Sequence, residues 1–403
     1  MSNDTLMHEL AADESRPNPY PIYERFRESP VTKLDDGSYA VSTYREITAL
    51  LHDPRISSNP ENLPVAPPNT PAVRPFILRD PPEHDRLRRI AMRHFGPPAT
   101  PDTIVGVEPE IQAVVDRLIN DLGNGGRIDI VDQFSYPLPV TVICELFGVP
   151  REDEPQFHVW GDELTAALGA RDRVDGAEEL ERQRGEAQMA LGAYLMGLLQ
   201  GHRDDPDDSM LSHMANDPND DRMTDLEIAA SGVLLFVAGH ETTVNLISNG
   251  MLTLLRHPDV LERFRGDPDL APSLVEELLR FEPPVQYLPN RSTIADIEIA
   301  GTTIPQGSHV NLLLAAGNRD PLQFENAERF VPDRRDNQHF GYGGGVHYCF
   351  GAPLARLEAQ IALAELVRRL RNPQLVTDPP PYRPSPVLRG PIHLLVDIDG
   401  IDP

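Results

Sequence analysis

The residue of this chain best suited to hold a metal is Cys349, one of only two cysteines. It lies in a glycine-rich loop, Tyr342–Gly351, directly before Ala352–Leu370, a stretch rich in Ala, Leu, Arg and Glu that is typical of a helix. The N-terminal end of a helix offers unpaired amide donors and a positive dipole, and both favour an anionic sulfur. Glycines let backbone amides approach that sulfur closely, so the loop suits a thiolate that holds a metal against flat backbone.

Two other kinds of site do not fit this loop. A phosphate-binding loop would need a Gly-x-Gly-x-x-Gly turn after a strand or a Lys-Ser/Thr ending, and neither is there. A zinc site would need four ligands, but His347 and Cys349 are only two, and no Cys-x-x-Cys pair exists elsewhere to complete the set. The loop therefore predicts a thiolate ligand for another kind of metal centre.

The loop resembles the ligand signature of the cytochrome P450 family, Phe-Gly-x-Gly-x-His-x-Cys-x-Gly. Every specified position except the first matches, and Tyr342 stands where the family usually has Phe. The resemblance implies haem b with Cys349 as its axial thiolate ligand. It also implies that Gly343 and Gly351 belong to the cofactor-binding loop, and that the Tyr342 phenol lies near the proximal face of the haem.

A second motif, Ala238–Thr243, lies within a mostly apolar stretch, Ser231–Leu255, that is predicted to form one long helix. Its sequence is Ala-Gly-His-Glu-Thr-Thr, and such residues are costly in an apolar helix unless the helix opens locally and they meet water or a ligand. A helix kink with a satisfied threonine is the simpler alternative. A zinc-protease motif is excluded, because Val244 stands where His-Glu-x-x-His requires its second histidine.

The second motif resembles the oxygen-activating motif of the same family. The resemblance implies that Thr242 hydrogen-bonds dioxygen and that Glu241 relays protons from solvent. Ala238 and Gly239 would lie against the haem in this arrangement. The two motifs together then supply the two faces of one haem site.

Glu277 and Arg280 are three residues apart on one face of a helix that Pro283 must end. Such a pair has almost no specificity by itself, because ion pairs at this spacing occur on most charged helices. It lies between the two motifs above, and Arg334 follows in Phe330–Arg334, which resembles the family's segment before the haem loop. The resemblance implies a buried structural ion network of the three charged residues, which is needed for stable haem incorporation.

Haem carries two propionates that need cationic partners. His84 and Arg88 are four residues apart and share a helix face. By resemblance to the family, the propionates contact His84, Arg88, Arg291 and His347. For each residue alone, the alternative is an ordinary surface cation.

The resemblance also indicates which segments line the substrate cavity. They are the loop before the His84 helix, the helices around Val159–Ala193, the oxygen helix, the segment after Pro284 and the C-terminal hairpin. The wall residues expected there are Leu63, Val65, Leu168, Leu235, Val285, Leu288 and Val387. Because all of them are apolar, we expect a small apolar organic substrate.

A chain of 403 residues can bury a large core. No linker or internal repeat divides the sequence, so we expect a single domain over residues 1–403. Helical patterns dominate from Glu83 to Leu279, and short strand-like runs occur at Ser38–Val41, Ile297–Ile304 and Ile392–Val396. The expected fold is mainly α with small β-sheets, as in the cytochrome P450 family.

The N-terminal segment Met1–Arg16 is polar and acidic, without the apolar core of a signal peptide or membrane anchor. The longest apolar run, around Val233–Ala238, is too short to span a bilayer. Cys144 lies in an apolar segment where a small buried thiol is ordinary, so no disulfide framework is expected. We therefore expect a soluble, cytoplasmic protein.

The formal net charge of -27 argues against nucleic acid and anionic membranes as partners. Lys33 is the only lysine, a bias typical of GC-rich, actinobacterial coding sequences. Electrons from a small acidic ferredoxin would require a local basic patch on the cysteine side of the haem. The candidates for that patch are Arg89, Arg93, Arg335 and Arg356.

The resemblance therefore implies a soluble bacterial class I monooxygenase. It would insert one atom of O2 into an apolar substrate, for example a macrolide, terpenoid or steroid secondary metabolite. Electrons would come from ferredoxin and its NAD(P)H-dependent reductase. A peroxide-driven peroxygenase of the same fold is one alternative, although those enzymes usually replace the acid-threonine pair with an arginine-containing one. A non-catalytic haem electron carrier or gas sensor is another, for which the oxygen motif would be superfluous.

Overall fold

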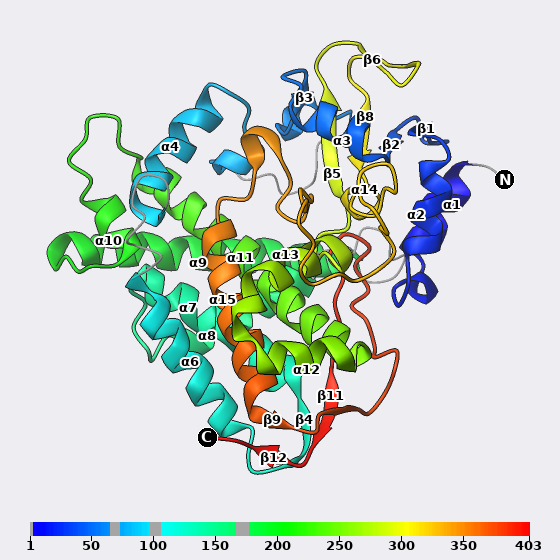
Figure 1. The fold of residues 1–403 in the computed structure, drawn as a ribbon. Coiled ribbons are helices and arrows are strands. Elements are labelled where there is room, and N and C mark those ends of the chain that lie inside the picture. Colours follow the sequence, from blue (N-terminus) through cyan, green and yellow to red (C-terminus); the bar gives the residue numbers. More distant parts are fainter. Residues whose placement is uncertain (1–2, 65–72, 97–105, 167–176) are drawn as a thin grey trace. The chain divides into compact units, whose positions relative to one another are not determined.

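The computed structural model describes residues 3–64, 73–96, 106–166 and 177–403 (Figure 1). The described chain is mainly helical with short strands, which confirms the expected fold class. Its contacts group into two units, each built from three separated segments. Unit 1 comprises Met1–Thr70, Asn245–Cys349 and Leu375–Leu395, and unit 2 comprises Pro71–Val244, Phe350–Gln374 and Val396–Pro403. The single-domain assignment over 1–403 stays a prediction.

Unit 2 is a helical assembly. Within α6 (Glu108–Asp121), the buried residues Ile111, Val115 and Leu118 recur at helical spacing, and this apolar face packs on α15 (Ala352–Arg369). The other helices of unit 2 are α4 (Glu83–Phe95), α7 (Pro137–Phe147), α8 (Glu154–Ala166), α9 (Ala177–Asp204) and α10 (Met210–Ala215). Its strands include β4 (Gly126–Asp129), β9 (Leu370–Arg371) and β12 (Gly400–Ile401), the last two of which pair with each other.

Unit 1 is built around a five-stranded sheet with the order β1-β2-β8-β5-β3. Only β2 and β8 run parallel, and the other pairs are antiparallel. Its core includes Val41, Ile47, Val310 and Leu312, all completely buried. The strands of the sheet are β1 (Val31–Lys33), β2 (Tyr39–Val41), β3 (Ile56–Ser57), β5 (Leu288–Thr293) and β8 (His309–Leu312).

The helices of unit 1 follow their sequence signals. α13 (Ala271–Phe281) buries Leu274 and Leu278 on one face and ends just before Pro283, as the proline requires. The remaining helices are α1 (Asn3–Ala11), α2 (Tyr20–Arg27), α3 (Tyr44–Leu51), α12 (Pro258–Gly266) and α14 (Leu314–Gly317).

Two of the three expected strand regions form as predicted. β2 lies within the first, and the second is a hairpin of β6 (Ile297–Ile299) and β7 (Thr302–Ile304). Ala300 and Gly301 have positive φ angles of 48° and 75°, as a two-residue hairpin turn requires. The third is only partly right, because β11 (Leu395–Ile398) begins three residues later than expected.

The longest helix, α11 (Asp225–Arg256), carries the second motif. Its residues up to Val244 belong to unit 2, and those from Asn245 belong to unit 1. By length and composition it could cross a membrane, but 61% of its most apolar window is buried inside the protein. This burial is typical of the central helix of a folded core. The long helix predicted over Ser231–Leu255 thus forms, and it begins six residues earlier and ends one residue later than expected.

Candidate active site

The Cys349 loop is a tight backbone cradle in unit 1. Gly343 and Gly345 have φ angles of 68° and 62°, in the left-handed region that favours glycine. A Cβ atom on Gly345 would lie 1.9 Å from the carbonyl oxygen of Leu51, so only glycine fits there. The Cys349 N–H donates a 2.9 Å hydrogen bond to the Tyr342 carbonyl, which closes the loop on itself.

The two cysteines lie in opposite settings. Cys144 is a buried free thiol on α7, and desolvation raises its pKa well above the usual range, so it stays neutral. Cys349 is partly exposed and is not in a disulfide, and α15 begins at Ala352 directly after its loop. A partly exposed cysteine in a glycine cradle suits a thiolate ligand to the iron of a flat cofactor such as haem. The donor set present therefore fits that cofactor at Cys349.

Residues beside the cysteine are aromatic or cationic. Tyr342 is buried, and its ring centroid lies 6.2 Å from those of His339 and Tyr348. His347 is half-buried in the single turn Gly345–His347. The buried phenol thus belongs to the packing of the loop itself, at the position where the signature has Phe.

The four cations expected at the propionates lie two in each unit. In unit 1, half-buried Arg291 lies on β5 opposite Val310, and His347 lies in the cysteine loop. In unit 2, His84 and half-buried Arg88 lie on α4. The His84 ring is 1% exposed, with its Nδ1 2.8 Å from the Asp85 carboxylate. His84 therefore already has one acidic partner within its own helix.

The second motif forms an accessible strip on α11. Leu234, Ala238 and Thr242 follow one another at four-residue spacing, so they share a face. Ala238 is exposed and the other two are half-buried, whereas His240 and Glu241 are buried. The Thr242 hydroxyl donates a 2.7 Å hydrogen bond to the Ala238 carbonyl, and the helix continues unbroken through the motif. The hydroxyl thus lies on the accessible face and is held by its own helix.

The buried His240 ring packs against aromatic residues, and the sequence did not predict these contacts. Its ring makes an edge-to-face contact with Tyr136, with the centroids 4.7 Å apart, and a stacked contact with Phe236 at 6.0 Å. A Cβ atom on Gly161 of α8 would lie 3.1 Å from the His240 ring, so glycine permits the close approach. Because Tyr136 and Gly161 lie far from the motif in sequence, only folding reveals this packing.

The structure brings Glu277, Arg280 and Arg334 together in unit 1. Arg280 donates two 2.8 Å hydrogen bonds to the Glu277 carboxylate, and both side chains are fully buried. Arg334 adds a 3.0 Å bond to the same carboxylate, and the Val331 N–H adds one of 2.9 Å. The Arg280 guanidinium also donates to backbone carbonyls, including that of Asn318 at 2.9 Å. Every charge in this network is thus hydrogen-bonded.

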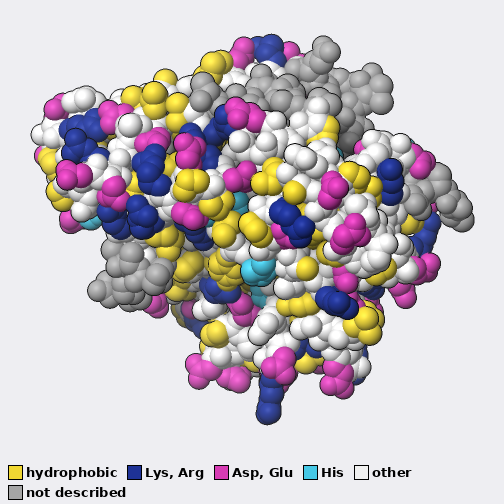
Figure 2. Space-filling view, turned by 90° about the horizontal axis from the view of Figure 1, so that it is seen from above, with side chains coloured by type: hydrophobic (Ala, Val, Ile, Leu, Met, Phe, Trp, Pro, Cys, Tyr) yellow, Lys and Arg dark blue, Asp and Glu magenta, His cyan; other side chains and the backbone are white. Residues whose placement is uncertain are grey.

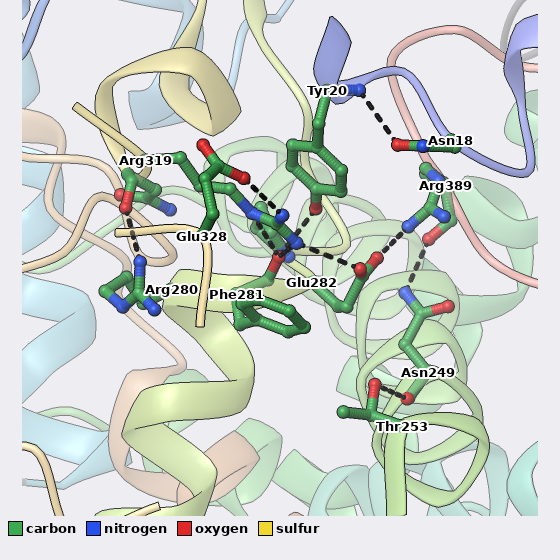
Figure 3. Close-up of polar contacts among 12 residues, drawn as sticks. Asn18, Tyr20, Asn249, Thr253, Arg280, Phe281, Glu282, Arg319, Glu328 and Arg389 are labelled. Atoms are coloured by element: carbon green, nitrogen blue, oxygen red, sulfur yellow. Dashed lines mark hydrogen bonds and ion pairs between the residues drawn. The ribbon is translucent and has the colours of Figure 1, made fainter. Parts of the chain in front are cut away.

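A second buried ion cluster lies nearby in the same unit, and no sequence motif predicted it (Figure 3). The Glu282 carboxylate pairs with Arg389 and, at 3.1 Å, with Arg319. The Arg319 guanidinium lies 3.2 Å from the centroid of the Tyr20 ring and donates to the Phe281 carbonyl at 2.6 Å. The cluster ties the N-terminal segment, the end of α13 and the C-terminal region together.

The expected wall residues differ in their burial and in the elements that carry them. Val285 pairs in an antiparallel bridge with Leu388, and the carbonyl of the adjacent Val387 accepts a 2.8 Å hydrogen bond from a backbone amide, so these two walls meet. Leu288 begins β5 and Leu63 is half-buried. On α11, Leu235 is only 8% exposed, whereas Leu234, one residue earlier, lies on the accessible strip. Val65 and Leu168 lie outside the described residues.

The four arginines expected to contact ferredoxin differ in their ion pairs and in their exposure. Arg89 and Arg93 of α4 both pair with Asp221, at 3.0 and 2.9 Å. Arg335 is exposed and Arg356 is half-buried. Figure 2 shows basic and acidic side chains interspersed over one face of the molecule, without a field of a single sign.

Comparisons with known proteins agree with this geometry. The family model Cytochrome P450 matches residues 38–396. Vitamin D(3) 25-hydroxylase of Pseudonocardia autotrophica is 37% identical over 96% of this chain and 95% of its own. 6-Deoxyerythronolide B hydroxylase of Saccharopolyspora erythraea is 34% identical over 98% of this chain and 100% of its own. The ligand-free crystal structure of Mycobacterium smegmatis CYP164A2 superposes with a TM-score of 0.88 at 36% identity, over 98% of this chain and 100% of that one.

Proposed function

The chain belongs to the cytochrome P450 family of haem-thiolate monooxygenases, and from this we propose that it oxygenates an apolar secondary metabolite, with Cys349 as the axial ligand of haem b. The proposal assigns the ligand to Cys349 because its loop is a glycine cradle and the other cysteine is a buried neutral thiol. His84, Arg88, Arg291 and His347 are the proposed propionate partners.

The observation that carries the reaction type is the acid-threonine pair on α11. When bound, haem supplies the activation of dioxygen. Thr242 presents its hydroxyl on the accessible strip, held 2.7 Å from the Ala238 carbonyl, and is the proposed proton donor at the reacting face. Buried Glu241 beside it is the proposed acid that replenishes that proton. A peroxygenase would not need this pair.

The proposed substrate class follows from the wall residues and the relatives. Val285, Leu288 and Val387 offer only apolar contacts, which favour a substrate with a large hydrocarbon surface. Two of the relatives are named as hydroxylases of vitamin D(3) and of 6-deoxyerythronolide B. A substrate of similar size and apolarity is proposed for this chain.

The proposed electron source is a ferredoxin with its NAD(P)H-dependent reductase, in the cytoplasm. The proposed contacts are Arg335, which is exposed, and Arg356, which is half-buried, while Arg89 and Arg93 both pair with Asp221. The net charge of -27 disfavours nucleic acid and anionic membranes as partners.

The test is turnover of vitamin D3 and 6-deoxyerythronolide B with NADPH, a bacterial ferredoxin and its reductase, under isotopically labelled dioxygen. The proposal predicts a product that carries one labelled oxygen atom. Product that forms only with added hydrogen peroxide, and without label from dioxygen, would support a peroxygenase instead. Reversible reduction of the haem without any product from a wider set of apolar compounds would support an electron carrier.

A further inference from the structure

The C-terminal segment 385–389 is fixed against segment 284–286 in unit 1. Two backbone hydrogen bonds of 2.8 Å join these segments, one on each side of the antiparallel bridge between Val285 and Leu388. The Ser385 hydroxyl accepts from the Leu388 N–H at 3.1 Å, which tightens the turn that leads into the bridge. Val285 and Val387, two of the proposed wall residues, are therefore carried by one paired element.

The end of this element rests directly on α11 (Figure 3). The Asn249 side-chain amide donates a 2.8 Å hydrogen bond to the Arg389 carbonyl, and Asn249 is only 2% exposed. A Cβ atom on Gly390 would lie 2.0 Å from Oδ1 of Asn245, so the backbone here touches the helix. The Asn249 Oδ1 atom is buried without a hydrogen-bond partner among the described residues. The described side-chain hydrogen bond of Asn249 is thus the one that joins α11 to this element.

The Arg389 side chain secures the same element from the opposite direction. Its guanidinium donates to the carbonyls of Arg16 and Pro17, at 2.7 and 2.9 Å, and pairs with the Glu282 carboxylate. Arg389 is 3% exposed, so these contacts are shielded from water. Its main chain thus bonds to α11, while its side chain bonds to the N-terminal segment and to the residue that follows α13.

We infer that Asn249 and Arg389 are positioning residues that set the distance between α11 and the substrate wall at Val285 and Val387. The inference deepens the proposed function and rests on it, because the wall is assigned there. A shift of this wall changes the space for a bulky apolar ligand. The affinity for a ligand that is small enough to contact only the iron does not change with the same shift.

The test compares two ligands of the ferric holoenzyme by their shift of the Soret band, imidazole as the small probe and ketoconazole as the bulky apolar probe. In Asn249→Leu, which keeps the side-chain size but removes the donor, ketoconazole affinity changes by about tenfold, the equivalent of one hydrogen bond. Imidazole affinity stays within about twofold. The matched control is Thr253→Val, which leaves both affinities unchanged, because the hydrogen bond of the Thr253 hydroxyl to the Asn249 carbonyl, at 2.7 Å, lies within α11 itself.

A second pair of variants separates positioning from general loss of stability. Gly390→Ala pushes the element off α11 and changes ketoconazole affinity. Adding Asn245→Ala removes the two shortest contacts, those with Oδ1 and Cγ of Asn245, and moves the affinity back toward the wild-type value. The inference would be overturned if the affinities for both probes changed equally, or if ketoconazole affinity stayed unchanged in Asn249→Leu and Gly390→Ala. It would also be overturned if adding Asn245→Ala to Gly390→Ala brought no recovery of ketoconazole affinity. If wild-type holoenzyme gave no imidazole shift at all, the proposed function itself would fail.

Discussion

Arg280 and Glu277 form a bidentate ion pair, with two 2.8 Å hydrogen bonds between side chains that are both completely buried. Two opposite charges out of water are tolerated only when every donor and acceptor is matched. Here the carboxylate also accepts from Arg334 and a backbone amide. The network joins α13 to the chain just before the cysteine loop, so damage to it reaches the haem site.

Replacing Glu277 by Gln tests this network. The substitution keeps the side-chain shape but leaves two arginines without their counter-charge, so we expect a loss of about 3–5 kcal/mol in the free energy of unfolding. Denaturant unfolding and the haem content per protein measure the effect, and both should fall. The control is Asp333→Asn, which removes an exposed ion pair to Arg263 and should cost less than about 1 kcal/mol. Similar losses for the two variants would contradict the proposed role of the buried network.

Two glycines of the cysteine loop, Gly343 and Gly345, should differ in how well they tolerate replacement by Ala. Gly345→Ala would place a Cβ atom 1.9 Å from the Leu51 carbonyl oxygen, so we expect loss of haem binding. Gly343→Ala meets no atom within 4 Å, and we expect only the backbone cost of a positive φ, about 1–2 kcal/mol. Haem content after purification distinguishes the two, with circular dichroism to check the fold. Equal haem content in both variants would show that the close approach to Leu51 is not required.

Replacing Thr242 by Ala tests the proposed proton donor. Without the hydroxyl, we expect product per NADPH to fall roughly tenfold or more, while oxygen consumption continues. The control is Thr243→Val, which alters the adjacent hydroxyl on a buried face of the helix. Simultaneous assays of product, NADPH and oxygen give the coupling. Unchanged coupling in Thr242→Ala would remove this residue from the proposed relay.

Glu358 on α15 predicts a pH dependence of stability. Burial raises its pKa to about 8, whereas an unfolded glutamate titrates near 4.3. Between these values the folded protein holds a proton that the unfolded chain has lost, so stability falls by up to about 1.4 kcal/mol per pH unit and levels off above pH 8. Glu358→Gln cannot titrate, and its advantage in unfolding free energy over wild type should grow from pH 5 to pH 8. A difference that stays constant with pH would contradict the buried, protonated carboxyl.

The contiguous motifs that carry the chemistry could be predicted from the sequence, whereas contacts between residues far apart in the chain could not. The motifs around Cys349 and Thr242 are contiguous, so their order and spacing alone indicated the family and its haem-thiolate chemistry, which the comparisons confirm. The Glu282 cluster draws on residues near both ends of the chain, which no local pattern connects. Similarly, Asp221 lies more than a hundred residues from Arg89, so their pairing appears only in the fold.

Side-chain direction along a helix is a second feature that composition does not determine. The helix phase places Leu234 on the strip with Ala238, whereas Leu235 is buried, and the role of Leu235 as a wall residue stays a prediction. One position along a helix turns a side chain by about 100°, which composition cannot resolve.

The central claim, that Cys349 is the thiolate ligand of the haem iron, is tested most directly by the absorption spectrum of the dithionite-reduced protein under carbon monoxide. Wild type and Cys144→Ser should both give the strongly red-shifted Soret band of a thiolate-ligated haem, and Cys349→Ser should lose it. A haem-loaded wild type without this band, or a Cys349→Ser variant that retains it, would contradict the assignment.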